Sequence, residues 1–271
     1  MTTVDFIIEL FCRVDTRIGH LPKHSQAKLY PSEIVTLGLL FALKGVGERA
    51  FYRWLRRDLL PWFPNLPERT RFFRLLATHQ DWTKAFLAEP TVLGVADSYG
   101  IELIHPIREG RSERQIGRKG VSNHRWIVGG KLGFVLDQFG RVVDWMCAPA
   151  NAHDQVFHPM IEQFVHTDPT TRQVSVDMIV LTDTGFHAKQ GDPANMKVCA
   201  RGTWNVRMIV ETVLSMLTVV CHTKKIGHRN WVYFGARLAF LMAVYNLCVQ
   251  WHGLLPDANG FVHLSIAEFG L

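Results

Sequence analysis

The stretch from Asp177 to Asp183, which reads DMIVLTD, constrains the fold more than any other part of the sequence. An apolar run without alternation is typical of a strand that is covered on both faces, as in a sheet with helices on either side. The run ends in Asp183, and a carboxylate at the end of a buried strand is costly unless a cation, a helix cap or a metal ion meets it. The stretch therefore predicts an α/β fold and singles out Asp183 as a candidate site residue.

Residues 1–90 have the pattern of helices. Pro31, Ser32 and Glu33 form a helix-start signature, the glycines of the segment 45–47 break the pattern, and a helix resumes in ERAFYRWLRRDLL. On a helical wheel the apolar residues of this second helix gather on one side, and its arginines lie on the other. Two helices around a three-residue turn, the second with a basic face, resemble a helix-turn-helix. The alternative is a solvated face on a helical bundle. The basic face contains Arg49, Arg53, Arg56 and Arg57.

From residue 91 the sequence changes to short apolar strands. TVLGVADS predicts one strand, and residues 126–150 predict two strands joined at Gln138–Gly140. A helix is expected in HDQVFHPMIEQFV, then the strand DMIVLTD and a short strand at MKVCA. Helices follow from about Trp204 to His222 and from about Trp231 to Trp251. We therefore expect a helical region over 1–90, a mixed-sheet domain over 91–255 and a tail over 256–271.

The composition narrows the class of protein. Hydrophobic residues make up 48% of the 271 residues, as in a globular domain. The five cysteines are scattered, which fits neither a disulfide framework nor a zinc site and suggests a reducing compartment. The N-terminus has no signal-peptide pattern. The apolar stretch Leu238–Trp251 contains Asn246 and Gln250 and is short for a membrane span, so a buried helix is expected.

Charge points weakly to a polyanionic partner. The formal net charge is +6, and many basic proteins bind no nucleic acid. A second basic cluster, REGRSERQIGRKG, covers Arg108–Gly120.

Three acidic residues form the candidate site. We expect Asp97 at the end of the first strand, Asp183 at the end of a later strand, and Glu211 on the polar side of a helix whose other side is apolar. One interpretation is structural: Asp183 caps a turn, and Glu211 pairs with Arg207 four residues earlier. The other is a site for Mg²⁺ or Mn²⁺, which prefer hard oxygen ligands.

Three further features have structural explanations. Asp154 can cap the helix that follows it, which is as good an explanation as a catalytic role. His153, His158 and His187 lack the spacing of a zinc site. Gly129 and Gly130 lie in a strand pattern, where close backbone packing explains them better than a phosphate loop does.

Four blocks occur in one order along the chain: ADSYG around Asp97, GGKLGFVLDQFGRVVDWMCAPANAHD, LTDTGF around Asp183, and WNVRMIVETVLSML around Glu211. With these blocks the chain resembles a DDE transposase of bacterial insertion sequences, with a ribonuclease H-like catalytic core, over about residues 30–250. The resemblance implies a Mg²⁺-dependent nuclease and strand transferase in which Asp97, Asp183 and Glu211 are both the catalytic acids and the ligands of two ions.

The same resemblance implies the partners and the place of action. These are double-stranded DNA (the terminal inverted repeats of the element and a target), a second copy of the chain in the active complex, and no membrane, in the cytoplasm of a bacterium at the nucleoid. Arg207 matches a family arginine, whereas Trp204 stands where a tyrosine is usual and Thr218 where a lysine is usual. The further DNA contacts that we expect are Lys131, Arg207, Lys224 and Lys225.

Two other functions stay open at this point. One is a DNA-binding protein with a degenerate catalytic fold, such as an inactive remnant of a transposase. The other is a ribonuclease H-like nuclease that acts on RNA or on repair intermediates. The presence of all three acids argues against the first, and a separate basic helical region argues against the second.

Overall fold

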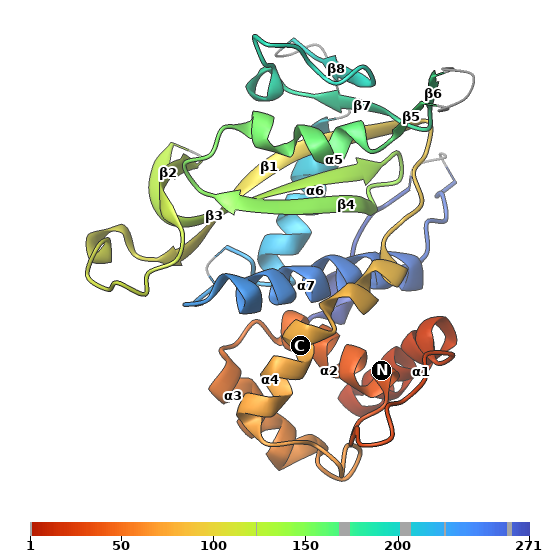
Figure 1. Ribbon diagram of the computed structural model, residues 1–271. Helices are drawn as coiled ribbons and strands as arrows, with labels where there is room; N and C mark the ends of the chain where they lie inside the picture. Colours follow the sequence, from red (N-terminus) through yellow and green to blue (C-terminus); the bar gives the residue numbers. More distant parts are fainter. Residues whose placement is uncertain (1, 123, 168–173, 201–206, 225, 259–261) are drawn as a thin grey trace.

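The computed structural model describes residues 2–122, 124–167, 174–200, 207–224, 226–258 and 262–271, and the protein is a mixed α/β structure. Figure 1 shows a helical part at one end and a curled mixed sheet at the other, with the long helix α7 between them. One apolar cluster runs from the first helix through α7 to one face of the sheet and includes Phe6, Leu40, Phe134 and Phe240.

The helices expected within residues 1–90 are present. This region contains α1 (Thr3–Ile18), α2 (Pro31–Lys44), α3 (Glu48–Trp54), α4 (Arg69–Thr78) and the 3-10 helix η2 (Gln80–Phe86). A π-helical turn, η1 (Leu55–Leu59), continues α3 directly. At the start of α2 the Glu33 carboxylate accepts a hydrogen bond of 2.6 Å from the Tyr30 amide, and Gly45 ends the helix with a φ of 64° that favours glycine.

The predicted division of the second helix of this pair, α3 with η1, into a buried apolar side and an exposed basic side is also confirmed. Phe51, Leu55 and Leu59 are buried, whereas Arg49, Arg53, Arg56 and Arg57 are exposed.

The main sheet has the strand order β2-β3-β1-β7-β8, and β4 pairs with β3 beyond the end of β2. The strands are β1 (Leu93–Ile104), β2 (Arg118–Ser122), β3 (Arg125–Asp137), β4 (Val142–Pro149), β7 (Ile179–Thr182) and β8 (Met196–Val198). The pairs among β1, β2, β3 and β4 are antiparallel, and β7 and β8 continue the sheet in parallel with β1. The short helices η3 (Pro106–Arg108) and η5 (Thr184–Phe186) follow β1 and β7.

Two expectations about these strands are wrong. Asp97 lies inside β1, not at its end, because pairing with β3 continues as far as Ile104. The strand β7 is not covered on both faces: Val180 is buried beside Met160 and Ile161 of α5 (His158–Glu162), whereas Ile179 on the opposite face is 37% exposed.

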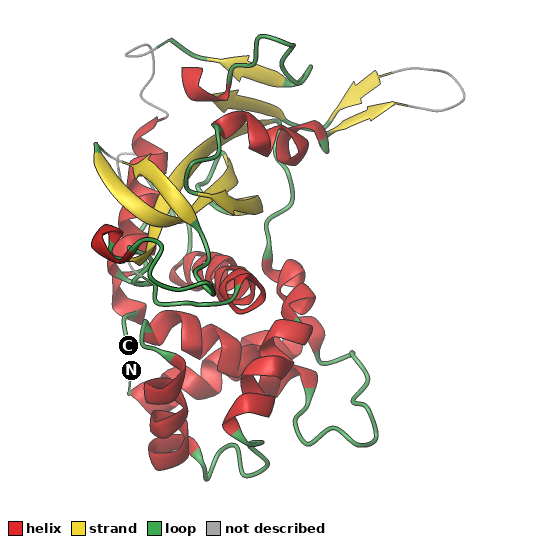
Figure 2. Ribbon diagram, turned by 60° about the vertical axis from the view of Figure 1, so that its left-hand side comes forward, coloured by secondary structure: helices red, strands yellow, loops and turns green. Residues whose placement is uncertain are grey.

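The sequence patterns did not predict β2 or the small hairpin of β5 (Val165–Thr167) and β6 (Val174–Val176), which projects from the body in Figure 2. The expected helix after residue 153 consists of η4 (Asp154–Phe157) and α5 and ends before β5. The helix that contains Glu211, α6 (Arg207–Val219), lies across the sheet from α5 (Figure 1).

The glycines of β3 are explained by close packing, as expected. A Cβ on Gly129 would meet the Ile101 carbonyl oxygen at 1.9 Å, and a Cβ on Gly133 would meet the Phe157 ring at 2.5 Å. These positions let β1 and η4 approach β3.

The closing helix, α7 (Trp231–His252), is buried as predicted, and its bounds agree with the expected ones to within one residue. With 22 residues it is long and apolar enough to cross a membrane, yet 83% of its most apolar window is buried inside the protein. Its Asn246 is fully buried and forms hydrogen bonds with both backbone groups of Val142 at the start of β4. This helix therefore joins the helical region to the sheet.

Candidate active-site cleft

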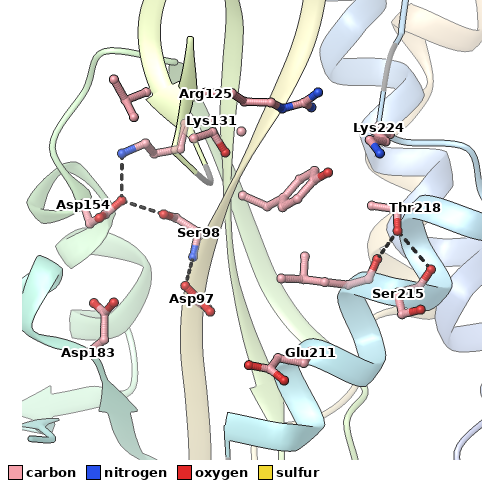
Figure 3. Close-up of a pocket in the computed structure, with 15 residues that line it drawn as sticks. Asp97, Ser98, Arg125, Lys131, Asp154, Asp183, Glu211, Ser215, Thr218 and Lys224 are labelled. Atoms are coloured by element: carbon pink, nitrogen blue, oxygen red, sulfur yellow. Dashed lines mark hydrogen bonds and ion pairs between the residues drawn. The ribbon is translucent and has the colours of Figure 1, made fainter. Parts of the chain in front are cut away.

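A cleft of about 790 Å³ opens where β7 ends and β1 continues. All three predicted acids line it, together with Lys131, Lys224 and Thr218 from the sequence analysis (Figure 3). It is also lined by Asp154, Ser98, Tyr99, Ser122, Arg125 and Ser215.

The register of the parallel strands explains why Asp97 and Asp183 meet. Val95 of β1 pairs with Leu181 of β7, and each aspartate follows its paired residue by two positions. Because side chains two apart on a strand point to the same face, the two carboxylates extend the pair on one side of the sheet. Asp97 is half-buried, and its Oδ1 accepts a hydrogen bond of 2.6 Å from the Ser98 amide.

Asp183 has both of the roles that the sequence left open. Its Oδ1 accepts a hydrogen bond of 2.9 Å from the Gly185 amide and so caps the turn of η5. Its side chain is also exposed to the cleft. Exposure removes the burial cost that made this carboxylate conspicuous in the sequence.

Glu211 faces the cleft from α6. Val210, Val213 and Leu217 are buried on the opposite side of the helix, as the wheel predicted, and Glu211 is exposed. Figure 3 shows its carboxylate directed toward the strand that contains Asp97. The side chain of Arg207, with which Glu211 would pair in the alternative interpretation, is not among the described side chains. Trp204 and Lys225 also lie outside the described residues.

A fourth acid, Asp154, belongs to the cleft, and its expected capping role is wrong. The residue that caps η4 is His153, without a side-chain hydrogen bond. The Oδ1 of Asp154 instead accepts a hydrogen bond of 2.6 Å from the Ser98 hydroxyl and one of 3.1 Å from Lys131 Nζ. Since these side chains of Lys131 and Asp154 are only 15% and 22% exposed, their ion pair is partly shielded from water.

Gly185 keeps two of these carboxylates close together. A Cβ at this position would lie 2.9 Å from Asp154 Oδ2 and 3.1 Å from Asp183 Oδ1. Asp154 is thus linked to Asp97 through Ser98 and adjoins Asp183 across Gly185.

Charges of opposite sign gather at the two ends of the cleft. In Figure 3, Arg125 and Lys224 lie at one end, and Asp183 and Glu211 lie at the other. Burial raises the pKa of Tyr99, which also lines the cleft, although the nearby Arg125 acts in the opposite direction. The uncharged phenol is a hydrogen-bond donor at neutral pH.

The donors in the cleft suit a hard divalent cation. Asp97, Asp183 and Glu211 offer carboxylate oxygens, and Mg²⁺ is typically held by one or two carboxylates while it keeps several waters. Among the residues that the structure describes, no three His, Cys, Asp or Glu side chains are close enough to form one compact metal-binding group. The three carboxylates line the cleft from separate elements of the fold.

The predicted DNA contacts fall into two places. Lys131 and Lys224 line the cleft, although Lys131 is held by Asp154 and by the Ala152 carbonyl oxygen. Arg49, Arg53, Arg56 and Arg57 lie on α3 and η1 in the separate helical region. Of these, Arg57 forms a 2.6 Å ion pair with the exposed Asp58.

Sequence reasoning missed Ser98 and Arg125 and left Asp154 between a capping role and a catalytic role. The segment ANAHD did offer a signal, since its acid follows a strand as Asp183 does. Arg125 had none, because its place at the cleft depends on how the β2–β3 hairpin folds over β1.

Comparisons with models of protein families, with curated proteins and with solved structures found no match for this chain.

Proposed function

We propose that the chain is a DDE-type DNA transposase, which cleaves the ends of a mobile element and joins them to target DNA with the help of Mg²⁺ or Mn²⁺. The observation that supports this most is the cleft itself. Carboxylates from β1, β7 and α6, which are distant in the sequence, line one cavity whose other end is cationic. A phosphodiester fits such a site, because its charge is attracted to cations while the reacting phosphate lies beside the acids.

The arrangement of strands in the sheet also supports a ribonuclease H-like core. Three antiparallel strands, β1, β3 and β4, are followed by β7 and β8 in parallel with β1. The pairing of β1 with β7 brings Asp97 and Asp183 close to each other.

In this proposal Asp97, Asp183 and Glu211 hold two divalent ions. Bound there, the ions would stabilise the attacking and leaving oxygens of an in-line displacement. Arg125 and Lys224 bind the phosphates of the strand. The pair of Lys131 and Asp154 holds Ser98, and through its backbone amide Asp97, in place.

The exposed arginines of α3 and η1 are proposed to bind the duplex away from the reacting phosphate. The substrates are then the terminal inverted repeats and a target duplex, and the active complex is a homodimer in the bacterial cytoplasm, at the nucleoid.

A Glu211→Gln variant tests the proposal. Glutamine keeps the size and the helix pattern but removes a negative oxygen from the ion site. We expect Mg²⁺-dependent nicking of DNA that contains the terminal repeats to fall by about 100-fold or more, as when one group that stabilises the transition state is lost. Binding to the same DNA should persist, since phosphate contacts do not need the glutamate. Glu162→Gln, an exposed glutamate on α5 outside the cleft, is the matched control.

Near-normal nicking by Glu211→Gln would contradict the three-acid site. If Glu211 only pairs with Arg207, the change should cost about 0.3–0.5 kcal/mol of stability and leave cleavage intact.

A second candidate is a DNA-binding protein with an inactive core. The exposed arginines of α3 and η1 would suffice for such a protein without a working cleft. Wild-type protein that binds the repeats, with an affinity that falls steeply with salt, but never nicks them in Mg²⁺ or Mn²⁺ would support this candidate.

A further inference from the structure

An exposed apolar patch lies near the tip of the β2–β3 hairpin. Val121 and Trp126 are cross-strand partners, and they are 54% and 60% exposed. Because directly opposite residues share one face of a hairpin, the two side chains form a single surface. We call these two residues the hairpin patch.

The hairpin patch borders the cleft at its cationic end. Val121 itself lines the cleft, as do Ser122 and Arg125 beside it. The tip also packs closely on β1, since a Cβ on Gly100 would come within 2.5 Å of the Ser122 side chain. Gly100 is three residues beyond Asp97 on the same strand. A strand bound along the cleft would therefore pass the patch on its way to the acids.

Basic residues lie beside the patch. The Lys119 ammonium lies 5.4 Å from the centroid of the Trp126 ring and 3.5 Å from the Glu109 carboxylate. The segment from His105 to Trp126 contains six lysines and arginines against two glutamates, and it includes the basic cluster that the sequence showed. An exposed indole among cations suits a polyanion with flat aromatic groups.

The size of the patch argues for a base over a protein surface. A stable protein interface buries about 800 Å² on each partner around an apolar centre that is depleted of charge. Here the apolar part is two side chains with Lys119 and Arg125 next to them. A single aromatic face of this size matches one nucleobase, and only an unpaired base can offer its face for stacking.

We propose that the hairpin patch is a stacking platform for an unpaired base of the nucleic acid strand whose phosphates lie along Arg125 and Lys224. The proposal rests on the proposed function, because it takes the cleft as the path of that strand. It adds a preference: duplex ends with unpaired nucleotides should bind better than fully paired ends.

The test compares two DNA probes with the full chain in a buffer that contains EDTA, so that no cleavage occurs. One probe is a blunt duplex, and the other is the same duplex with a short single-stranded overhang. Trp126→Ala should weaken binding of the overhang probe by about 5- to 150-fold, the equivalent of about 1–3 kcal/mol for one stacked base. Binding of the blunt probe should be unchanged. Trp126→Phe should retain most of the overhang preference, because the ring face persists.

Trp62→Ala is the matched control, since Trp62 is 52% exposed but lies in the helical region. It should leave the ratio of the two affinities unchanged, and thermal unfolding of both alanine variants should match the wild type because both indoles are exposed.

Three results would overturn the stacking proposal. These are equal losses for the two probes in Trp126→Ala, no loss for either probe, or a change from dimer to monomer in that variant, which would make the patch a protein interface. If the wild-type chain nicks DNA and the Trp126→Ala variant gives any of these results, only the stacking platform is refuted. A wild-type chain that neither binds nor nicks DNA refutes the proposed function as well.

Discussion

Asn246 provides a prediction whose magnitude follows from the structure. Its Oδ1 accepts a hydrogen bond of 2.7 Å from the Val142 amide. Its Nδ2 donates one hydrogen bond of 2.7 Å to the Val142 carbonyl and another of 3.0 Å to the Phe86 carbonyl. The side chain is fully buried on α7. It therefore imitates a neighbouring strand at the start of β4 and joins the helical region to the sheet.

Asn246→Leu keeps the approximate shape but removes these three hydrogen bonds. The Val142 carbonyl keeps its hydrogen bond of 2.9 Å from the Ala88 amide. The groups that lose the asparagine as a partner without such a replacement are therefore the Val142 amide and the Phe86 carbonyl. An unsatisfied buried group costs about 1–3 kcal/mol, so we expect a loss of about 2–6 kcal/mol. At about 2–4 °C per kcal/mol, the melting temperature should fall by roughly 4–24 °C.

Asn246→Asp separates hydrogen bonding from shape. One carboxylate oxygen still accepts from the Val142 amide, while the other faces two carbonyl oxygens and favours protonation. The pKa of the new carboxyl should therefore rise on folding. Because the folded state then binds more protons than the unfolded state above the ordinary carboxyl pKa, the deficit relative to wild type should grow as pH rises from 4 to 7.

Equilibrium urea unfolding of wild type and both variants at several pH values measures these differences. Val249→Ala, a purely apolar truncation at a buried site on the same helix, is the control and should show a cost without this pH dependence. A deficit below about 1 kcal/mol in Asn246→Leu, or a pH-independent deficit in Asn246→Asp, would refute the reasoning.

Two further predictions concern a buried histidine and the cleft. Burial, with the nearby Arg237, lowers the pKa of His228 to about 4; the unfolded state then binds more protons between about pH 4 and 6.5, so roughly 3 kcal/mol of stability should be lost as pH falls through that window. His228→Phe should flatten this acid limb in unfolding curves, and the exposed His263→Ala should not. Gly185→Ala should push apart the carboxylates of Asp154 and Asp183: nicking should require at least several-fold more Mg²⁺ while the melting temperature changes little. Gly227→Ala, where a Cβ would meet nothing within 4 Å, is the control, and an unaltered Mg²⁺ dependence would contradict the placement.

The sequence was sufficient for much of the secondary structure because the relevant signals are local. Proline and glutamate at the start of α2, Gly45 at its end, and the glycine in the turn between β3 and β4 set backbone angles that neighbouring residues can reveal. The helical period likewise predicted which side of α6 is buried, and so the exposure of Glu211. Local signals failed for β1, whose length depends on its pairing with β3, a strand more than twenty residues later.

The candidate site divides in the same way. The sequence by itself determined the types and order of Asp97, Asp183 and Glu211, since an acid next to an apolar strand or on the polar side of a helix is visible in the pattern. Only the tertiary structure decided that these acids line one cleft, that Asp154 pairs with Lys131, and that Arg125 and Lys224 lie at the opposite end. The physical reason is that strand register and helix packing fix distances between residues far apart in the chain, whereas a sequence pattern records only the preferences of neighbours.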